Sequence, residues 1–562
     1  MGVYKLFLAG ISLSVVLFSC QTEEQKSIER KSGTLDFKVE QARLDSLKEG
    51  MSKTVWRSNA VEKKQSKSPN WAVELKPFLD ADFNRPGVIE KYTKTIFESP
   101  LSGWKDIVWV ANDPKQTTRW SVYRYEGDTC IGVSIGVDKE TEAYRMSEQL
   151  TYMPSYGYVI ENAQNLNYLD GEQFFLEAQF ENKAQPWRMF FDIGEQSIPV
   201  NFDLKITSEK TELLFYQGKE TIIVEAIKTD SGYFAEMPIF QSYLKFEKNN
   251  DTMSGTFHNL DKGPKYVVPF EASRLSVSHR LNYDPTQNYA NLAGKWEVHF
   301  GKGDDAYAAI GIFDRLGDDL IGTFATETGD YRFLQGKIVG DSFSLSTFDG
   351  SHLFLFTGKI KGDEITEGRF YSGTHYTNTW RAKRNEQFEL ADPNKMTSLK
   401  GKEEQINFTF PDLDNRLVSL SDEEYRNKVV LIQILGSWCP NCMDETRYFV
   451  ELYNKYHDQG LEIIGLSFER STEFKEAKKS LSKAITGLNV PYKMLIAGTP
   501  GESGKALPML TEILSYPTSI IMDRNGNVVK IHTGFYGPGT GDYYQKYTQE
   551  TETLLEQLLR AE

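Results

Sequence analysis

The chain is poor in cysteine and in basic residues, and both shortages limit what it can be. It has 4 cysteines in 562 residues, too few for a disulfide framework to hold the fold together. Its 64 lysines and arginines are outnumbered by 79 aspartates and glutamates, which gives a formal net charge of -15. Because the chain lacks the basic surface that neutralises phosphates, we expect no nucleic-acid partner and no attraction to anionic lipid. A net negative charge is more compatible with protein partners than with nucleic acid or anionic lipid.

Long hydrophobic runs are also missing. The most apolar stretch, from Leu6 to Phe18, follows Lys5 and is shorter than the about 20 residues that a membrane span needs. A positive residue, a short apolar run and then the small Ser19 are typical of a secretory signal. We therefore predict a signal peptide over residues 1–19 and an exported protein.

The end of this run, Leu17 to Cys20, resembles a bacterial lipobox. In a lipobox the signal is cut before the cysteine, and the new amino terminus receives a lipid. The resemblance implies lipidation at Cys20 and attachment to a bacterial membrane, facing the periplasm or the cell exterior. An ordinary signal peptide with an incidental cysteine is the alternative.

At its length the chain needs more than one core, and we expect about three or four domains. Residues 20–70 are rich in Lys, Glu, Gln and Ser, which predicts a lipidated tether with one exposed helix near Leu35 to Met51. From Trp71 on, short aromatic-rich runs are separated by Asp, Gly and Pro. This pattern indicates a β or α+β domain over residues 71–172.

The middle of the chain contains an internal repeat. Arg274 follows Trp187 by 87 positions, and Arg384 follows Trp296 by 88. Because the aromatics and glycines between them recur in the same order, we predict a duplication. Each copy indicates short alternating strands, as in a sandwich or an up-and-down barrel, and two lipocalin-like barrels or one fused β structure are equally compatible. The copies are assigned to residues 173–288 and 289–385.

The last part of the chain, residues 402–562, follows a linker over residues 386–401. The run VVLIQILGS predicts a buried central strand, the segment CPNCMDETRYFVELYNKYHDQG a helix, and LEIIGLSF a second strand. STEFKEAKKSLSKAI predicts another helix, YPTSIIMD and NVVKIHT a hairpin, and roughly Tyr543 to Leu559 a final helix. This is the thioredoxin order. We predict a multidomain protein with a β-rich N-terminal region and a C-terminal α/β thioredoxin-like domain.

Cys439 and Cys442 are separated by two residues where the first strand turns into the helix. That spacing alone suits zinc, a static disulfide or a redox pair, but zinc needs four ligands. At a helix start, free N–H groups and the helix dipole stabilise an anion, so the Cys439 thiol should lose its proton readily. We expect Cys439 to attack a substrate disulfide and the more shielded Cys442 to resolve the product; a static disulfide is the alternative. Pro440 suits the first helical turn.

GSWCPNCMDE behind a buried strand, and SYPTSIIMDRNGNVV about 75 residues later, resemble the TlpA and ResA type of membrane-attached thiol-disulfide oxidoreductase. The resemblance covers about residues 402 to 562. It implies that Pro517 is a cis-proline that faces the cysteines and exposes a backbone edge to the substrate. The residues it assigns to substrate binding are Trp438, Pro440, Tyr516, Pro517 and Thr518.

Some ResA-like proteins also place a glutamate after the second strand, near the cysteine pair, and Glu469 in GLSFERS occupies the matching position. A buried Glu469 would hold a proton near neutral pH and deliver it during exchange. A solvent-facing Glu469 paired with Arg470 is equally compatible with the sequence.

Together these patterns predict an exported, membrane-anchored thiol-disulfide oxidoreductase that reduces client proteins with disulfides. The resemblance implies a membrane thiol electron donor, and we expect no cofactor and no metal. The alternative is a binding or assembly lipoprotein, whose β domains capture a ligand while the thioredoxin-like domain recruits partners.

Overall fold

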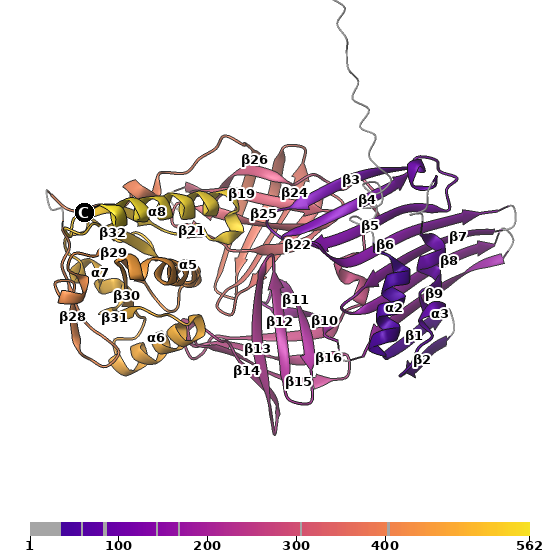
Figure 1. The fold of residues 1–562 in the computed structure, drawn as a ribbon, viewed down its shortest axis with the longest axis horizontal. Coiled ribbons are helices and arrows are strands. Elements are labelled where there is room, and N and C mark those ends of the chain that lie inside the picture. Colours follow the sequence, from indigo (N-terminus) through magenta and orange to yellow (C-terminus); the bar gives the residue numbers. More distant parts are fainter. Residues whose placement is uncertain are drawn as a thin grey trace, which may run out of the picture.

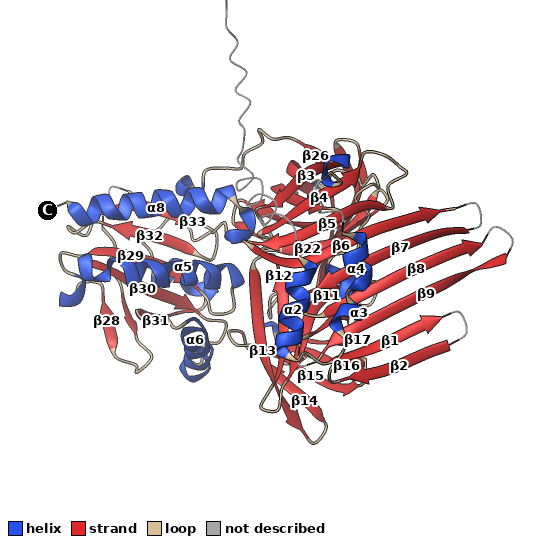
Figure 2. Cartoon of the chain, turned by 45° about the vertical axis from the view of Figure 1, so that its right-hand side comes forward, coloured by secondary structure: helices blue, strands red, loops and turns tan. Residues whose placement is uncertain are grey.

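The chain forms four units: an open β-sheet, two β-barrels and a C-terminal α/β domain (Figure 1, Figure 2). The open sheet and the α/β domain lie at opposite ends of the long axis, with the barrels between them (Figure 1). The computed structural model describes residues 35–57, 60–82, 87–141, 144–166, 169–181, 183–303, 306–401 and 405–561. The predicted signal peptide and Cys20 lie outside these residues.

The first unit is an antiparallel nine-stranded sheet in the order β2-β1-β9-β8-β7-β6-β5-β4-β3. Short helices pack on one face around Phe37, Phe78 and Tyr152. The strands are β1 (Met51–Arg57), β2 (Ala60–Ser66), β3 (Tyr92–Ser99), β4 (Trp104–Ala111), β5 (Thr118–Glu126), β6 (Thr129–Glu140), β7 (Tyr144–Met153), β8 (Gly157–Leu166) and β9 (Leu169–Phe180). The helices are α2 (Phe37–Leu47), α3 (Trp71–Glu74), α4 (Lys76–Ala81) and the short η1 (Ile89–Lys91).

This unit begins earlier than the sequence indicated, because the predicted tether is folded from α2 to β2. Asp36 caps α2 by accepting hydrogen bonds from the N–H groups of Lys38 and Val39. Phe37 and Leu44 are buried, and β1 pairs with both β2 and β9. The tether assignment therefore does not hold here. A few apolar residues, spaced as in a helix or a strand, pack this segment against the sheet. The average composition of residues 20–70 is polar and does not reveal them.

The second unit is a closed antiparallel barrel of eight consecutive strands. They are β10 (Gln185–Asp192), β11 (Ser197–Ile206), β12 (Thr211–Gln217), β13 (Glu220–Thr229), β14 (Gly232–Glu236), β15 (Ser242–Asn249), β16 (Thr252–Asn259) and β17 (Val267–Arg274), with η2 (Leu260–Lys262) in the last loop and η3 (Val277–Arg280) after the barrel. The barrel interior is a packed core of aromatic and aliphatic side chains, as expected for so few strands.

The third unit repeats this plan, since pairing between β19 and β20 closes its sheet on itself. Its strands are β18 (Gly294–Phe300), β19 (Tyr307–Leu316), β20 (Asp319–Thr326), β21 (Gly329–Asp330), β22 (Leu334–Val339), β23 (Ser342–Phe348), β24 (Leu353–Lys361), β25 (Glu364–Ser372) and β26 (Tyr376–Arg384). β21 is a two-residue strand paired only with the end of β20.

The tryptophan and the arginine that mark each predicted repeat lie where the first and last strands of each barrel pair. Trp187 pairs with Arg274 where the first and last strands of the first barrel meet, and Trp296 pairs with Arg384 at the same place in the second. Both tryptophans are fully buried. The internal repeat and the barrel alternative are therefore confirmed.

The two barrels share part of their cores. Phe348, at the end of β23 in the second barrel, enters the first barrel and packs against Phe191, Phe215 and Phe257 at ring-centroid distances of 5.0 to 5.2 Å. The Gln217 side-chain amide donates to the Phe348 carbonyl at 2.7 Å. The structure thus has two closed barrels with separate cores, and Phe348, Leu353 and Leu355 of the second barrel extend into the core of the first.

The C-terminal domain has a five-stranded sheet in the order β31-β30-β29-β32-β33, with β29, β30 and β31 parallel. Its elements are β27 (Thr409–Pro411), β28 (Leu417–Ser419), η6 (Glu423–Tyr425), β29 (Val429–Leu435), α5 (Pro440–Tyr456), η7 (His457–Gln459), β30 (Leu461–Phe468), α6 (Phe474–Leu488), β31 (Lys493–Gly498), η8 (Pro500–Glu502), α7 (Ser503–Ala506), β32 (Thr518–Met522), β33 (Val528–Thr533), η9 (Pro538–Thr540) and α8 (Asp542–Arg560). This is the predicted thioredoxin-like order, with the wholly buried β29 at its centre.

The predicted linker, residues 386–401, joins this domain before its end. It contains the short helix η5 (Pro393–Lys395). The Thr397 hydroxyl contacts that of Thr533 at 2.9 Å, and Leu399 forms a β-bridge with Leu510. The linker assignment is therefore too long at its C-terminal end. Within the described ranges, no helix combines the length and the apolar character needed to cross a membrane.

Candidate functional site

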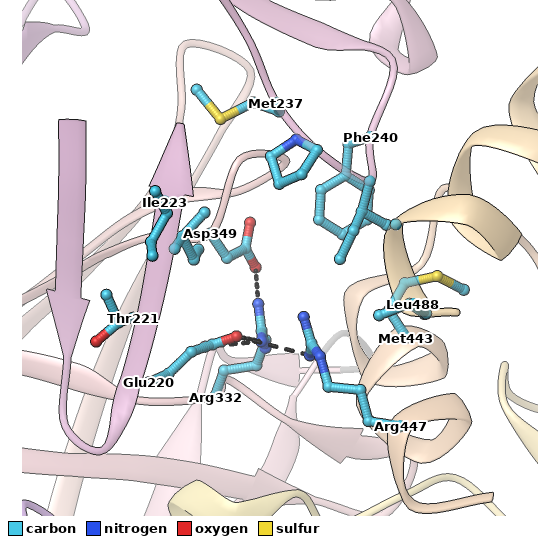
Figure 3. Close-up of a pocket in the computed structure, with 14 residues that line it drawn as sticks. Glu220, Thr221, Ile223, Met237, Phe240, Arg332, Asp349, Met443, Arg447 and Leu488 are labelled. Carbon is cyan, nitrogen blue, oxygen red and sulfur yellow. Dashed lines mark hydrogen bonds and ion pairs between the residues drawn. The ribbon is translucent and has the colours of Figure 1, made fainter. Parts of the chain in front are cut away.

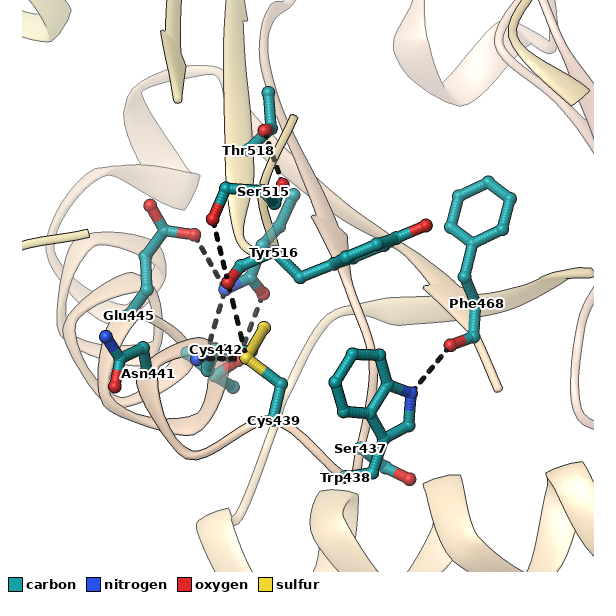
Figure 4. Close-up of a disulfide and its surroundings, with 12 residues drawn as sticks. Ser437, Trp438, Cys439, Asn441, Cys442, Glu445, Phe468, Ser515, Tyr516 and Thr518 are labelled. Atoms are coloured by element: carbon teal, nitrogen blue, oxygen red, sulfur yellow. Dashed lines mark hydrogen bonds between the residues drawn. A yellow bond between two sulfur atoms is a disulfide. The ribbon is translucent and has the colours of Figure 1, made fainter. Parts of the chain in front are cut away.

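Cys439 and Cys442 lie where β29 turns into α5, and they form a disulfide with Cα atoms 5.3 Å apart (Figure 4). Cys439 is the N-cap residue of α5, and its Sγ accepts a hydrogen bond from the Cys442 N–H at 3.2 Å. Pro440 fills the first helical position. Cys439 is 7% exposed and Cys442 is 0% exposed. Cys439 is therefore the less buried of the two cysteines.

The Tyr516–Pro517 peptide bond is cis, as the resemblance implied. The Tyr516 carbonyl oxygen lies 3.4 Å from Cys439 Sγ, so this loop borders the disulfide directly (Figure 4). The Thr518 hydroxyl donates to the Ser515 carbonyl at 2.8 Å and closes the loop behind the proline. The loop thus presents main chain beside the exposed sulfur.

Trp438 forms another wall of the site. Its indole N–H donates to the Phe468 carbonyl at 2.9 Å, and its ring meets the Tyr516 ring edge-on at 5.7 Å. The Arg470 guanidinium lies over the other part of the indole, 4.6 Å from its centroid. These contacts fix a large aromatic surface next to Cys439.

Glu469 is buried, with 2% of its surface exposed, so the solvent-facing alternative is wrong. Its carboxylate accepts hydrogen bonds from the Ser437 N–H at 3.0 Å, from the Ser437 hydroxyl at 2.7 Å and from the Ser467 hydroxyl. Burial raises the pKa of Glu469 above its ordinary value, and the three hydrogen bonds oppose that rise. Glu469 therefore contacts the turn that carries the cysteines, through Ser437, rather than the sulfurs themselves.

Glu445 is a second buried carboxyl group, which the sequence reasoning missed. It is fully buried on α5, three residues after Cys442. The Gln433 side-chain amide donates to Glu445 Oε2 at 2.9 Å and also to the Cys442 carbonyl at 3.3 Å. The Tyr547 hydroxyl donates to Glu445 Oε1 at 2.9 Å. One amide group thus links this carboxyl to the backbone of the buried cysteine.

Burial raises the pKa of Glu445 to about 7, although the hydrogen bonds from Gln433 and Tyr547 favour the charged form. The spacing of the buried residues along α5 indicates that the Glu445 side chain faces the core. Cys442, Glu445, Phe449 and Leu452 follow one another at intervals of three or four residues and all face the core. A glutamate on an otherwise apolar helix stripe is a buried carboxyl, and that inference could have been made from the sequence.

A disulfide between cysteines two residues apart at a helix start, bordered by a cis-proline loop at the edge of a mixed five-stranded sheet, defines the class of thioredoxin-like proteins. Residues 400–545 match the Redoxin family model. The chain is 26% identical over 132 residues to "Thiol-disulfide oxidoreductase ResA" of Halalkalibacterium halodurans, covering 24% of this chain and 68% of that protein. It is 28% identical over 161 residues to a protein of the same name from Bacillus cereus, covering 29% of this chain and 82% of that one.

The chain thus spans about two thirds of the length of the first of these relatives. Among solved structures, a putative thiol:disulfide interchange protein DsbE from Chlorobium tepidum is 22% identical, covering 29% of this chain and 99% of that one. The TM-score of 0.22 is too low to support an argument. The Redoxin match and the ResA relatives support thiol-disulfide oxidoreductase activity in the C-terminal domain.

Proposed function

We propose that this protein is a membrane-anchored, extracytoplasmic thiol-disulfide oxidoreductase that reduces disulfides of client proteins through Cys439 and Cys442. The geometry of Cys439 supports this most directly, because its sulfur caps α5 and accepts a hydrogen bond from the Cys442 N–H, and because Cys439 is the less buried cysteine of the pair. A donor N–H and the positive end of a helix stabilise negative charge on that sulfur.

The exchange begins with both cysteines reduced. The Cys439 thiolate attacks one client sulfur, a Cys439–client disulfide forms, and the other client sulfur leaves as a thiolate. The Cys442 thiol loses its proton and attacks Cys439, which releases the second client sulfur and leaves the Cys439–Cys442 disulfide. Two electrons pass to the client, and a thiol donor at the membrane must return two. Protons from solvent and from Cys442 complete the client thiols.

The surface that receives the client consists of Trp438, Pro440 and the cis-proline loop from Tyr516 to Thr518. Trp438 offers an aromatic face, and Tyr516 offers main chain beside the reacting sulfur. This combination suits an extended peptide segment, since main-chain contacts hold a peptide whatever its sequence.

The reduction potential of the full chain tests the direction of transfer. A value near about -270 mV fits a reductant, whereas a value near about -120 mV means that the protein oxidises its clients. If the pre-reduced chain transfers electrons to no disulfide, the oxidoreductase proposal fails. The binding or assembly role would then explain the β domains better.

Replacing Cys20 tests the anchor. Cys20→Ala should release the mature protein from the membrane fraction, because no lipid can then be attached. Cys130→Ser is the matched control, because it removes a cysteine from β6 and should leave the protein at the membrane. Fractionation followed by immunoblotting measures both. A Cys20→Ala protein that stays as firmly bound as the parent contradicts lipidation.

Glu469 should influence how easily Cys439 ionises. Glu469→Gln removes a negative charge near the cysteine turn, so alkylation of the reduced protein should extend to lower pH, and turnover should fall because a proton carrier is lost. The pH profile of iodoacetamide labelling measures the first effect. Glu473→Gln is the control, since Glu473 is exposed before α6. Unchanged labelling and turnover would leave Glu469 with a purely structural role.

A further inference from the structure

A segment of the second barrel lies on the redox site. The connection between β20 and β22, residues 327–333, contacts loops that border Cys439. Ser515, directly before Tyr516, donates its hydroxyl to the Thr328 carbonyl at 2.7 Å. Asn441, between the two cysteines, donates its side-chain amide to the Asp330 carbonyl at 3.0 Å.

The same segment reaches a further loop, after β33. The Gly537 N–H donates to the Asp330 carboxylate. A Cβ atom added to Gly534 would lie 2.8 Å from the Thr328 carbonyl oxygen. On the barrel side, a Cβ added to Gly329 would lie 2.6 Å from Asn441 Nδ2. The two surfaces therefore approach closely, and this contact is possible because both glycines lack a side chain.

Arg332 holds the segment in place through a cluster of acidic groups (Figure 3). Its guanidinium donates to the Asp444 carboxylate on α5 at 2.7 and 2.9 Å, and to Glu220 of the first barrel at 2.7 Å. It also pairs with Asp349 at 3.2 Å. The arginine is 6% exposed and joins both barrels to the helix that carries Cys442.

We propose that residues 327–333 form an intramolecular gate, which packs against residues bordering the client surface of the redox domain and must leave before a protein client can reach Cys439. The gate offers backbone carbonyls to Ser515 and Asn441, as an extended client peptide would. Because Ser515 adjoins Tyr516 and Asn441 lies between the two cysteines, the gate takes up space that a client bound along the cis-proline loop would need. This inference rests on the proposed function, and it makes the barrels a control element for the dithiol.

The gate predicts different access for small and large disulfides. Oxidised glutathione is small and needs little room beside Cys439, whereas a protein loop needs the space next to Ser515 and Asn441 that Thr328 and Asp330 occupy. Loosening the gate should therefore raise the rate with a protein disulfide more than the rate with glutathione disulfide.

Two variants loosen the gate by independent means. Arg332→Gln removes the ion pairs with α5, and Gly329→Val places a branched side chain against Asn441. The control is Gly340→Val in the β22–β23 turn of the same barrel. Gly340 also has a positive φ, of 63°, but a Cβ there would meet no atom within 4 Å. Gly340→Val thus also places a branched side chain at a positive φ, but without touching the redox domain.

The measurement is single-turnover oxidation of the pre-reduced full chain by insulin and by oxidised glutathione. Both gate variants should raise the insulin-to-glutathione rate ratio by about tenfold, which corresponds to about 1.4 kcal/mol of lost docking contacts. Gly340→Val should leave the ratio unchanged. An insulin-to-glutathione rate ratio that is unchanged or lower in both folded gate variants overturns the proposal. A lower ratio would mean that residues 327–333 help to bind the protein client.

Hydrogen exchange separates this proposal from the proposed function. Peptides covering residues 436–446 and 512–518 should exchange faster in Gly329→Val than in the parent or in Gly340→Val, whether or not the protein turns over. If the parent reduces no disulfide but exchange accelerates, the oxidoreductase proposal fails and the docking contact stands. If exchange is the same in all variants, the gate is wrong even where activity is found.

Discussion

Cys442→Ser should accumulate covalent complexes with clients, and Cys439→Ser should accumulate almost none. Cys439 lies at the start of α5 and is the less buried of the two cysteines, so it remains able to attack when Cys442 is replaced. The mixed disulfide then persists, because the residue that would resolve it is gone. Both variants should lose turnover by several orders of magnitude, as removal of a nucleophile or its obligate partner does in other covalent mechanisms.

Non-reducing electrophoresis of membrane extracts measures the trapped complexes, and added dithiothreitol should release them. Cys130→Ser is the matched control. Burial raises the pKa of the Cys130 thiol to about 12, so it stays protonated and unreactive, and its replacement should change neither trapping nor turnover. Equal trapping by Cys439→Ser and Cys442→Ser would refute the division of roles between them.

Glu445→Gln should change how the stability of the C-terminal domain depends on pH. Burial raises the pKa of Glu445 to about 7 in the folded protein, whereas the unfolded chain has an ordinary glutamate. Between the ordinary pKa of glutamate, about 4.5, and the folded-state pKa of about 7, Glu445 holds a proton in the folded state that it has released in the unfolded state. Folding stability therefore falls as pH rises from about 4.5 to about 7, by a total of about 3 kcal/mol.

The glutamine variant has no such proton, so its stability should fall clearly less than that of the parent over the same pH range, with the remaining fall due to other buried carboxyl groups such as Glu469. Denaturant titration followed by hydrogen exchange in α5 reports this domain separately from the barrels. Glu451→Gln, at an exposed position on the same helix, should keep the slope of the parent. A parent domain that is equally stable at pH 5 and pH 8 would mean that Glu445 titrates like an exposed carboxyl.

The parts of the fold that the sequence predicted depend on local pattern. The buried run before Cys439, the helical stripe after it and the hairpin at Asn525 each occupy consecutive residues, so their periodicity can be read along the chain. The spacing from Trp187 to Arg274 can also be recognised in the sequence, because nearly the same spacing recurs from Trp296 to Arg384. The thioredoxin-like domain and the duplication follow from such patterns, whereas the choice between a sandwich and a barrel does not.

The features that the sequence did not predict depend on contacts between distant residues. Phe37 and Leu44 are two apolar residues in a polar segment, and they find their partners on strands that come about a hundred residues later. Asn441 meets Asp330 across 111 positions, and only the packing of separate domains brings them together. No periodicity marks such a pair, so the covered redox site could not be foreseen.

Phe348 links the two barrels that arose by duplication. By sequence it belongs to the second barrel, but its ring completes the core of the first. A chain that ends before the second barrel would expose Phe191, Phe215 and Phe257 at an open mouth, and a patch of that kind promotes aggregation. The first barrel therefore depends on the second for part of its core.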